Sequence, residues 1–146
     1  MSVLGVRCHK DKFTFVIVDG STDAPRIVDH GVRRLPAGKR GEQLTWVRRE
    51  VEELHRRHGV TAASFKAAET TGTPDASRGE VEGVLQQTLD ECGIGATGRR
   101  KNQLKSALDL GSAKGAFDDA LRSAPFTSVP VDRREALAVA MAEQRA

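Results

Sequence analysis

The stretch FTFVIVD (residues 13–19) is rich in β-branched and aromatic residues, which favour a strand. A shorter apolar run over residues 3–7 precedes it, and the few polar residues between the two runs are enough for a hairpin turn. After a loop rich in turn-forming residues, residues 27–35 form a third strand-like run that ends before Pro36. The sequence therefore predicts three successive antiparallel strands, a meander.

Helices and strands alternate in the remainder of the chain. The predicted elements are a helix over residues 41–58, a strand over 60–69, a helix that begins with a capping box of Ser77 and Glu80, a strand over 96–100, a short helix or strand-end segment over 101–108, a helix over 112–122, and a last helix from about Asp132. This order predicts an α/β fold in which a mixed five-stranded sheet is flanked by helices, in a single domain over residues 1–146.

Composition narrows the classes of function. The chain has 146 residues and a net charge of only +3, so any nucleic-acid-binding surface must be local. Five Phe, one Trp and no Tyr argue against a platform that stacks single-stranded bases. The two isolated cysteines match no metal or redox spacing, and no segment has the pattern of a signal peptide or membrane span. We therefore expect a cytoplasmic protein with reduced thiols and no membrane partner.

The stretch DRREALAVA (residues 132–140) places two carboxylates, Asp132 and Glu135, three residues apart at the head of a small-residue helix. The pair could bind a divalent metal if other carboxylates approach from elsewhere in the chain. The same spacing also fits a capping box, with Asp132 as N-cap and Glu135 at N3, which needs no chemistry. Both interpretations stay open at this point.

Three motifs in register resemble the RuvC-type Holliday-junction resolvases of the ribonuclease-H-like superfamily. DRREALAVA is similar to their final active-site helix, and FKAAE (residues 65–69) is similar to the strand that delivers a metal-binding Glu. QLK (residues 103–105) followed by LGSAK (residues 110–114) resembles a segment whose lysines contact DNA in that family. The resemblance covers nearly the whole chain and implies a ribonuclease-H-like fold and a homodimer.

The resemblance also implies a metal site. RuvC-type enzymes hold two Mg²⁺ or Mn²⁺ ions with four carboxylates, and Glu69, Asp132 and Glu135 would fill three of these positions as catalytic and metal-binding residues. In the first strand, where the family has Gly-Ile-Asp, this chain has Gly5-Val6-Arg7. A guanidinium there would repel Mg²⁺ and could pair with Glu69 or Asp132, so Arg7 is a candidate for blocking the site.

Two other acids are poorly placed to replace the missing carboxylate. Asp11 lies four residues beyond Arg7, about 13 Å along an extended chain, and falls in the predicted hairpin turn. Asp19 falls at the far end of the second strand. The sequence therefore predicts a degenerate nuclease site, although a single metal held by Glu69 and Asp132 would still permit hydrolysis.

The densest basic group is a candidate nucleic-acid-binding surface that would contact backbone phosphates. Its members are Arg99, Arg100, Lys101, Lys105 and Lys114. The alternative is an ordinary solvated face. Trp46 falls off the apolar stripe of its helix, so it either contributes to a homodimer interface or covers the edge of the core.

Three hypotheses of function follow. The first is a nucleic-acid-associated RuvC-like protein, binding branched or single-stranded DNA or RNA, with a degenerate nuclease site. The second is an active endonuclease or resolvase that depends on Mg²⁺ or Mn²⁺. The third is a protein-interaction scaffold without nucleic-acid binding, which similarity of fold cannot exclude.

Overall fold

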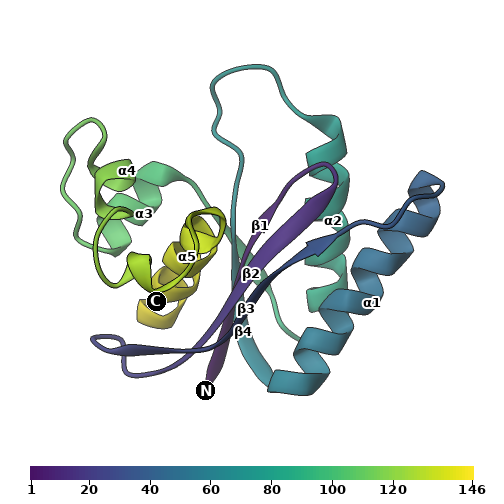
Figure 1. Cartoon of the computed structure of the whole chain (residues 1–146), viewed down its shortest axis with the longest axis horizontal. Coiled ribbons are helices and arrows are strands. Elements are labelled where there is room, and N and C mark those ends of the chain that lie inside the picture. Colours follow the sequence, from purple (N-terminus) through teal and green to yellow (C-terminus); the bar gives the residue numbers. More distant parts are fainter.

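The computed structural model describes residues 1–146, and its centre is a five-stranded mixed sheet (Figure 1). The strands are β1 (Ser2–Cys8), β2 (Lys12–Gly20), β3 (Pro25–Arg34), β4 (Val60–Lys66) and β5 (Ala96–Arg99), in the spatial order β3-β2-β1-β4-β5. The first three strands pair antiparallel, whereas β4 pairs parallel with both β1 and β5. The predicted meander and the mixed sheet are therefore confirmed.

Two long helices, α1 (Arg40–His58) and α2 (Ala76–Glu91), follow the predicted helical periodicity. Gly59 ends α1 in the left-handed conformation at φ 59°, which favours glycine. The start of α2 differs from the prediction, because the Asp75 side chain caps it by accepting a hydrogen bond from the backbone N–H of Arg78 at 3.1 Å. The predicted capping box of Ser77 and Glu80 is therefore wrong: both residues lie inside the helix, and Glu80 pairs with Arg40.

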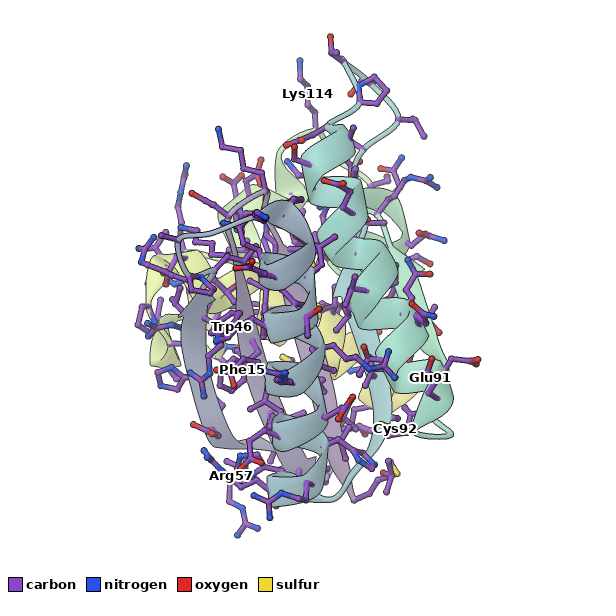
Figure 2. The ribbon with its side chains drawn as sticks, turned by 90° about the vertical axis from the view of Figure 1, so that its right-hand side faces the viewer. Phe15, Trp46, Arg57, Glu91, Cys92 and Lys114 are labelled. Carbon is purple, nitrogen blue, oxygen red and sulfur yellow. The ribbon has the colours of Figure 1, made fainter.

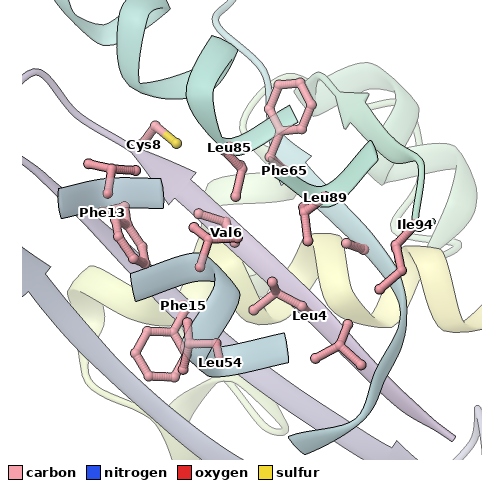
Figure 3. Close-up of a cluster of buried hydrophobic side chains, with 14 of the residues drawn as sticks. Leu4, Val6, Cys8, Phe13, Phe15, Leu54, Phe65, Leu85, Leu89 and Ile94 are labelled. Atoms are coloured by element: carbon pink, nitrogen blue, oxygen red, sulfur yellow. The ribbon is translucent and has the colours of Figure 1, made fainter. Parts of the chain in front are cut away.

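The two faces of the sheet are covered differently. Helices α1 and α2 lie on one face, and α5 (Arg134–Arg145) lies on the other together with the smaller helices (Figure 1). Because side chains alternate along a strand, Leu4, Val6 and Cys8 of β1 point toward α1 and α2. There they join Phe13, Phe15 and other apolar side chains in a buried cluster, shown in Figure 3.

The opposite face of β1 is set by a close approach of α5. The helix is buried along most of its length and rich in alanine, and it crosses β1 at Gly5. A Cβ atom at Gly5 would collide with the backbone oxygen of Ala136 and would lie 2.8 Å from the Cβ of Ala140. The absence of a side chain at Gly5 thus lets α5 lie directly on β1, with its first turn near the end of that strand.

After α1, two element boundaries differ from the prediction, and one segment that the sequence left open is resolved. Residues 101–108 form a helix, α3 (Lys101–Ala107). Within residues 112–122 only α4 (Ala116–Ala120) is helical, because Gly111 and Gly115 adopt positive φ angles that interrupt a helix. The strand predicted over 60–69 ends at Lys66. Two 3₁₀ turns, η1 (Phe126–Ser128) and η2 (Val131–Arg133), precede α5.

None of the helices combines the length and the apolar character that a membrane crossing requires.

Candidate functional site

The carboxyl ends of β1 and β4 carry two cations side by side. Val6 is in register with Phe65 in this parallel pair, so the next residues, Arg7 and Lys66, are neighbours. Both belong to the set of alternate positions that faces α5. Parallel strands present their carboxyl ends at one edge of the sheet, where α/β folds commonly place ligands.

Arg7 forms an ion pair with Glu135 in the first turn of α5. The two side chains are 29% and 17% exposed, so the pair is largely screened from water. Burial, followed by repulsion from Arg78, lowers the pKa of Arg7, but a guanidinium stays protonated at neutral pH. The sequence had suggested Glu69 or Asp132 as the partner of Arg7; the structure places Glu135 there instead.

Lys66 is almost completely buried, with 4% of its side chain exposed. Its Nζ donates hydrogen bonds to the carboxylate of Glu69 and to the backbone oxygen of Ala67, each at 2.8 Å. Burial lowers the pKa of Lys66, and the contact with Glu69 acts against that shift. A buried lysine is rare unless it is paired, so this ammonium is committed to Glu69.

Glu69 lies three residues beyond the end of β4, and not on the strand itself as the sequence predicted. Its carboxylate accepts hydrogen bonds from Lys66 Nζ and, at 3.2 Å, from the backbone N–H of Lys101 at the start of α3. Although partial burial alone would raise it, these two hydrogen bonds lower the pKa of Glu69 below its usual value. The acid is therefore held ionised between two donors.

Asp132 lies in η2 and is exposed. Its carboxylate is 3.7 Å from Nε of Arg133, a long contact at the surface. The N-cap of α5 is Arg133, and no side chain caps that helix, so the predicted capping box of Asp132 and Glu135 is wrong. The 3₁₀ turn takes up the residues that would have formed the cap.

The other two acids weighed for this site lie apart from it. Asp11 is in the turn between β1 and β2, where its backbone oxygen accepts a hydrogen bond from Leu35. Asp19 is near the opposite end of β2 and pairs with Arg26 at 2.8 Å.

The residues present do not fit a two-metal centre. Mg²⁺ requires several hard oxygen ligands at once, and no group of three or more His, Cys, Asp or Glu side chains converges anywhere in the structure. Glu135 is bound to Arg7 and Glu69 to Lys66, so a metal would have to displace an internal cation at each. In this arrangement both carboxylates are neutralised by internal cations.

Sequence reasoning missed Lys66, because no local breaker marks the end of β4 before Thr70. The sequence did hold a signal: Lys66 follows Ala62 and Ser64 at every second position of the strand, which puts Lys66 on the face toward α5. A lysine at an inward position of an apolar strand indicates a buried partner.

The predicted basic residues fall into two groups. The side chain of Arg99 is internal, since it bonds to Ser64 at 3.2 Å and pairs with Glu143 of α5 at 3.3 Å. Lys101 lies 3.4 Å from Asp118, and the exposed Arg100 donates to the backbone oxygen of Ala68.

Lys105 and Lys114 form no ion pair. Lys105 is half-buried in the last turn of α3, and Lys114 lies in the segment that follows this helix. Lys105 lines an open polar hollow of about 460 Å³. Its other lining residues are Asn102, Ser106, Asp109, Gly111 and Ser112. Lys114 is exposed in the turn before α4 and projects from one end of the molecule (Figure 2).

Solved structures with a similar fold include Holliday-junction resolvases. Thermus thermophilus RuvC in complex with a Holliday junction superimposes with a TM-score of 0.77, at 19% identity, over 97% of this chain and 91% of that one. A second structure of Thermus thermophilus RuvC gives the same TM-score at 18% identity, over 97% of this chain and 92% of that one. This chain has a RuvC-like, ribonuclease-H-like fold.

A more distant structural neighbour is the Fowlpox virus resolvase in complex with Holliday-junction DNA, with a TM-score of 0.55 at 8% identity over 99% and 97% of the two chains. No protein-family profile matches the sequence, and no curated protein matches it significantly. The RuvC-like assignment is therefore one of fold, which leaves function to be argued from the site.

Proposed function

We propose that this protein binds nucleic acid through a RuvC-like surface and does not cleave it, because internal cations neutralise the acids of its former nuclease centre. The observation that carries the proposal is the adjacent pair Arg7 and Lys66 at the ends of β1 and β4, bound to Glu135 and Glu69. An acid committed to a lysine or arginine in a partly buried pair is a poor ligand for Mg²⁺.

Nucleic-acid binding is supported by fold and charge together. The similar solved structures include two resolvases in complex with Holliday-junction DNA. The cations Lys105 and Lys114, which lie in the segment that resembles a DNA-contacting one, are free of ion pairs, and Lys105 lines a polar hollow. Such groups suit contacts to phosphates, which give affinity without base recognition. Branched DNA is the substrate class that the fold favours.

The test is binding and cleavage of a fluorescein-labelled four-way DNA junction, measured by anisotropy and by denaturing gel. We expect binding in EDTA that needs no divalent metal, no cleavage with Mg²⁺ or Mn²⁺, and weaker binding by the variant Lys105→Ala/Lys114→Ala. A matched control is Arg56→Ala/Arg57→Ala, which removes two charges from the last turn of α1.

Two results would contradict the proposal in different ways. Junction cleavage in MgCl₂ that Glu135→Gln abolishes would identify an active endonuclease. Absence of binding to DNA and to RNA at low salt would leave only a protein-interaction scaffold.

A homodimer is part of the same proposal. Trp46 is half-buried and packs at the edge of the cluster under α1, so it leaves part of a large ring available to a second copy. Analytical ultracentrifugation would show a dimer in the wild type and a larger monomer fraction in Trp46→Ala.

A further inference from the structure

A second group of cations gathers at the same end of the sheet as Arg7. The turn after β1 and the connection after β3 bring together residues 9–12 and 33–40, which contain six Lys or Arg residues and a single acid, Asp11. The two segments are joined in space, since Lys12 is in register with Arg34 and the backbone N–H of Leu35 donates to the oxygen of Asp11 at 2.9 Å.

Four of these six cations are free. Arg33 lies 3.5 Å from Glu50 and over the ring of Phe15, and Arg40 pairs with Glu80 at 3.0 Å. No carboxylate lies within ion-pair distance of the remaining four. These four residues, here called the hairpin ridge, are Lys10, Lys12, Arg34 and Lys39.

The hairpin ridge continues toward the candidate site. Thr14 is in register with Arg7, and Lys12 is two residues before Thr14, so Lys12 and its partner Arg34 lie on the face of the sheet that bears Arg7. His9 lies in the turn between β1 and β2, where its backbone N–H donates to the oxygen of Lys12 at 2.9 Å. Burial, followed by repulsion from Arg7, Lys12 and Arg78, lowers the pKa of His9 to about 4. Lys12 and Arg34 therefore lie on the same face and at the same end of the sheet as Arg7.

The ridge is also preorganised. Arg40 donates to the backbone oxygen of Lys10 at 2.9 Å, and Gln43 donates to that of Pro36 at 2.9 Å, so helix α1 holds both segments in place. Fixed cations lose less freedom on binding than those of a mobile loop.

The ridge and the pair Lys105 and Lys114 flank the carboxyl end of β1 from opposite sides. Strands β2 and β3 lie on one side of β1, and β4 and β5, which lead into α3, lie on the other. In Figure 1 the tip of the β1–β2 hairpin lies near α2, and helices α3 and α4 lie well apart from it. No exposed aromatic side chain accompanies the ridge that could stack bases, which favours contacts to the backbone of a duplex.

We infer that the hairpin ridge binds the phosphate backbone of the same DNA that Lys105 and Lys114 contact, so that DNA crosses the site over Arg7. This inference rests on the proposed nucleic-acid binding and adds a second phosphate-binding surface to it. Phosphate contacts of this kind position DNA without reading its sequence.

The test is the salt dependence of four-way-junction binding by Lys12→Ala/Arg34→Ala, compared with Arg56→Ala/Arg57→Ala. Both variants lose two charges, but Arg57 lies at the opposite end of the molecule from Lys114 (Figure 2). We expect the ridge variant to bind at least about tenfold more weakly and to lower the slope of log Kobs against log salt by about 2, whereas the control changes neither.

Each outcome bears on a different claim. If the ridge variant binds like the control while Lys105→Ala/Lys114→Ala binds weakly, the ridge is excluded and the proposed function stands. If the wild type binds no nucleic acid at low salt, both are overturned. Lys10→Ala/Lys39→Ala, which alters only exposed side chains, gives a second reading of the ridge should the first variant unfold.

Discussion

The two faces of β1 have opposite characters, although they alternate along one seven-residue strand. Toward α1 and α2 the strand presents only apolar side chains, which join a dry cluster. Toward α5 it presents Val3, then Gly5, and then Arg7, so this face changes within three positions from core to charged site. The first face holds the fold together, and the second uses the same strand to position an arginine against a helix.

The largest effect should come from Gly5→Val, because the new side chain would collide with the backbone of α5. We expect a loss of about 3 kcal/mol or more in the free energy of unfolding, measured by urea denaturation. Leu4→Ala on the opposite face should also cost about 2–5 kcal/mol, but by leaving a cavity. The two should differ in site integrity: Gly5→Val should also weaken junction binding, whereas folded Leu4→Ala should bind normally. Equal junction binding by the two variants would show that the packing of α5 on β1 does not determine the geometry of the DNA-binding site.

The next effect concerns the ion pair between Arg7 and Glu135. Glu135→Ala leaves a half-buried guanidinium without its partner, so we expect a loss of about 1–3 kcal/mol in the free energy of unfolding. Arg7→Met/Glu135→Leu should recover most of that loss, because it removes both charges. The control Asp132→Ala should stay within about 0.5 kcal/mol. If the double variant lost at least as much free energy of unfolding as Glu135→Ala, the direct ion pair between Arg7 and Glu135 would be contradicted.

His9 reports on the charge around Arg7. Burial and the cations Arg7, Lys12 and Arg78 hold the pKa of His9 at about 4, so its ring should titrate well below the usual range in an NMR pH series. Arg7→Met removes one of these cations and should raise the pKa of His9, and bound DNA should raise it further. The ring resonances can be assigned with His9→Gln. A titration near 6.5 in the free wild type would contradict the burial of this ring beside Arg7 and Lys12.

The smallest effect should be the pH dependence caused by Glu69. Because its pKa is lowered in the folded state, Glu69 contributes stability that is present above its unfolded value of 4.5 and is lost as the pH falls through the folded value. Urea unfolding of Glu69→Gln should therefore show a shallower decline in acid than the wild type. An identical acid limb would mean that Lys66 does not hold this carboxylate in solution.

The architecture could be predicted from the sequence because each of its main elements has a recognisable local pattern of residues. The run of β-branched and aromatic residues over 13–19 and the helical periodicity over 41–58 each determine one element, and the order of such elements restricts the sheet topology. The failures are at element ends. Gly111 and Gly115 shortened a predicted helix, and the end of β4 at Lys66 follows from where β1 and β5 stop pairing.

The candidate site was only partly predictable for the same reason. The sequence shows that Arg7 replaces the expected carboxylate. Which acid pairs with Arg7 depends on how α5 is rotated about its axis, and the 3₁₀ turn η2 changes that rotation. Glu135 therefore faces Arg7, and Asp132 stays exposed. Lys66 and the hairpin ridge depend on register between distant segments, which no local pattern records.

The central claim is that Arg7 and Lys66 take the place of metal at this end of the sheet. Calorimetric titration of Mn²⁺ into the wild type and into Arg7→Asp/Lys66→Glu tests it most directly. The account predicts no binding heat in the wild type and measurable Mn²⁺ binding in the variant, where Glu69 and Glu135 would be joined by two new carboxylates. Binding of Mn²⁺ by the wild type that Glu135→Gln abolishes would contradict it.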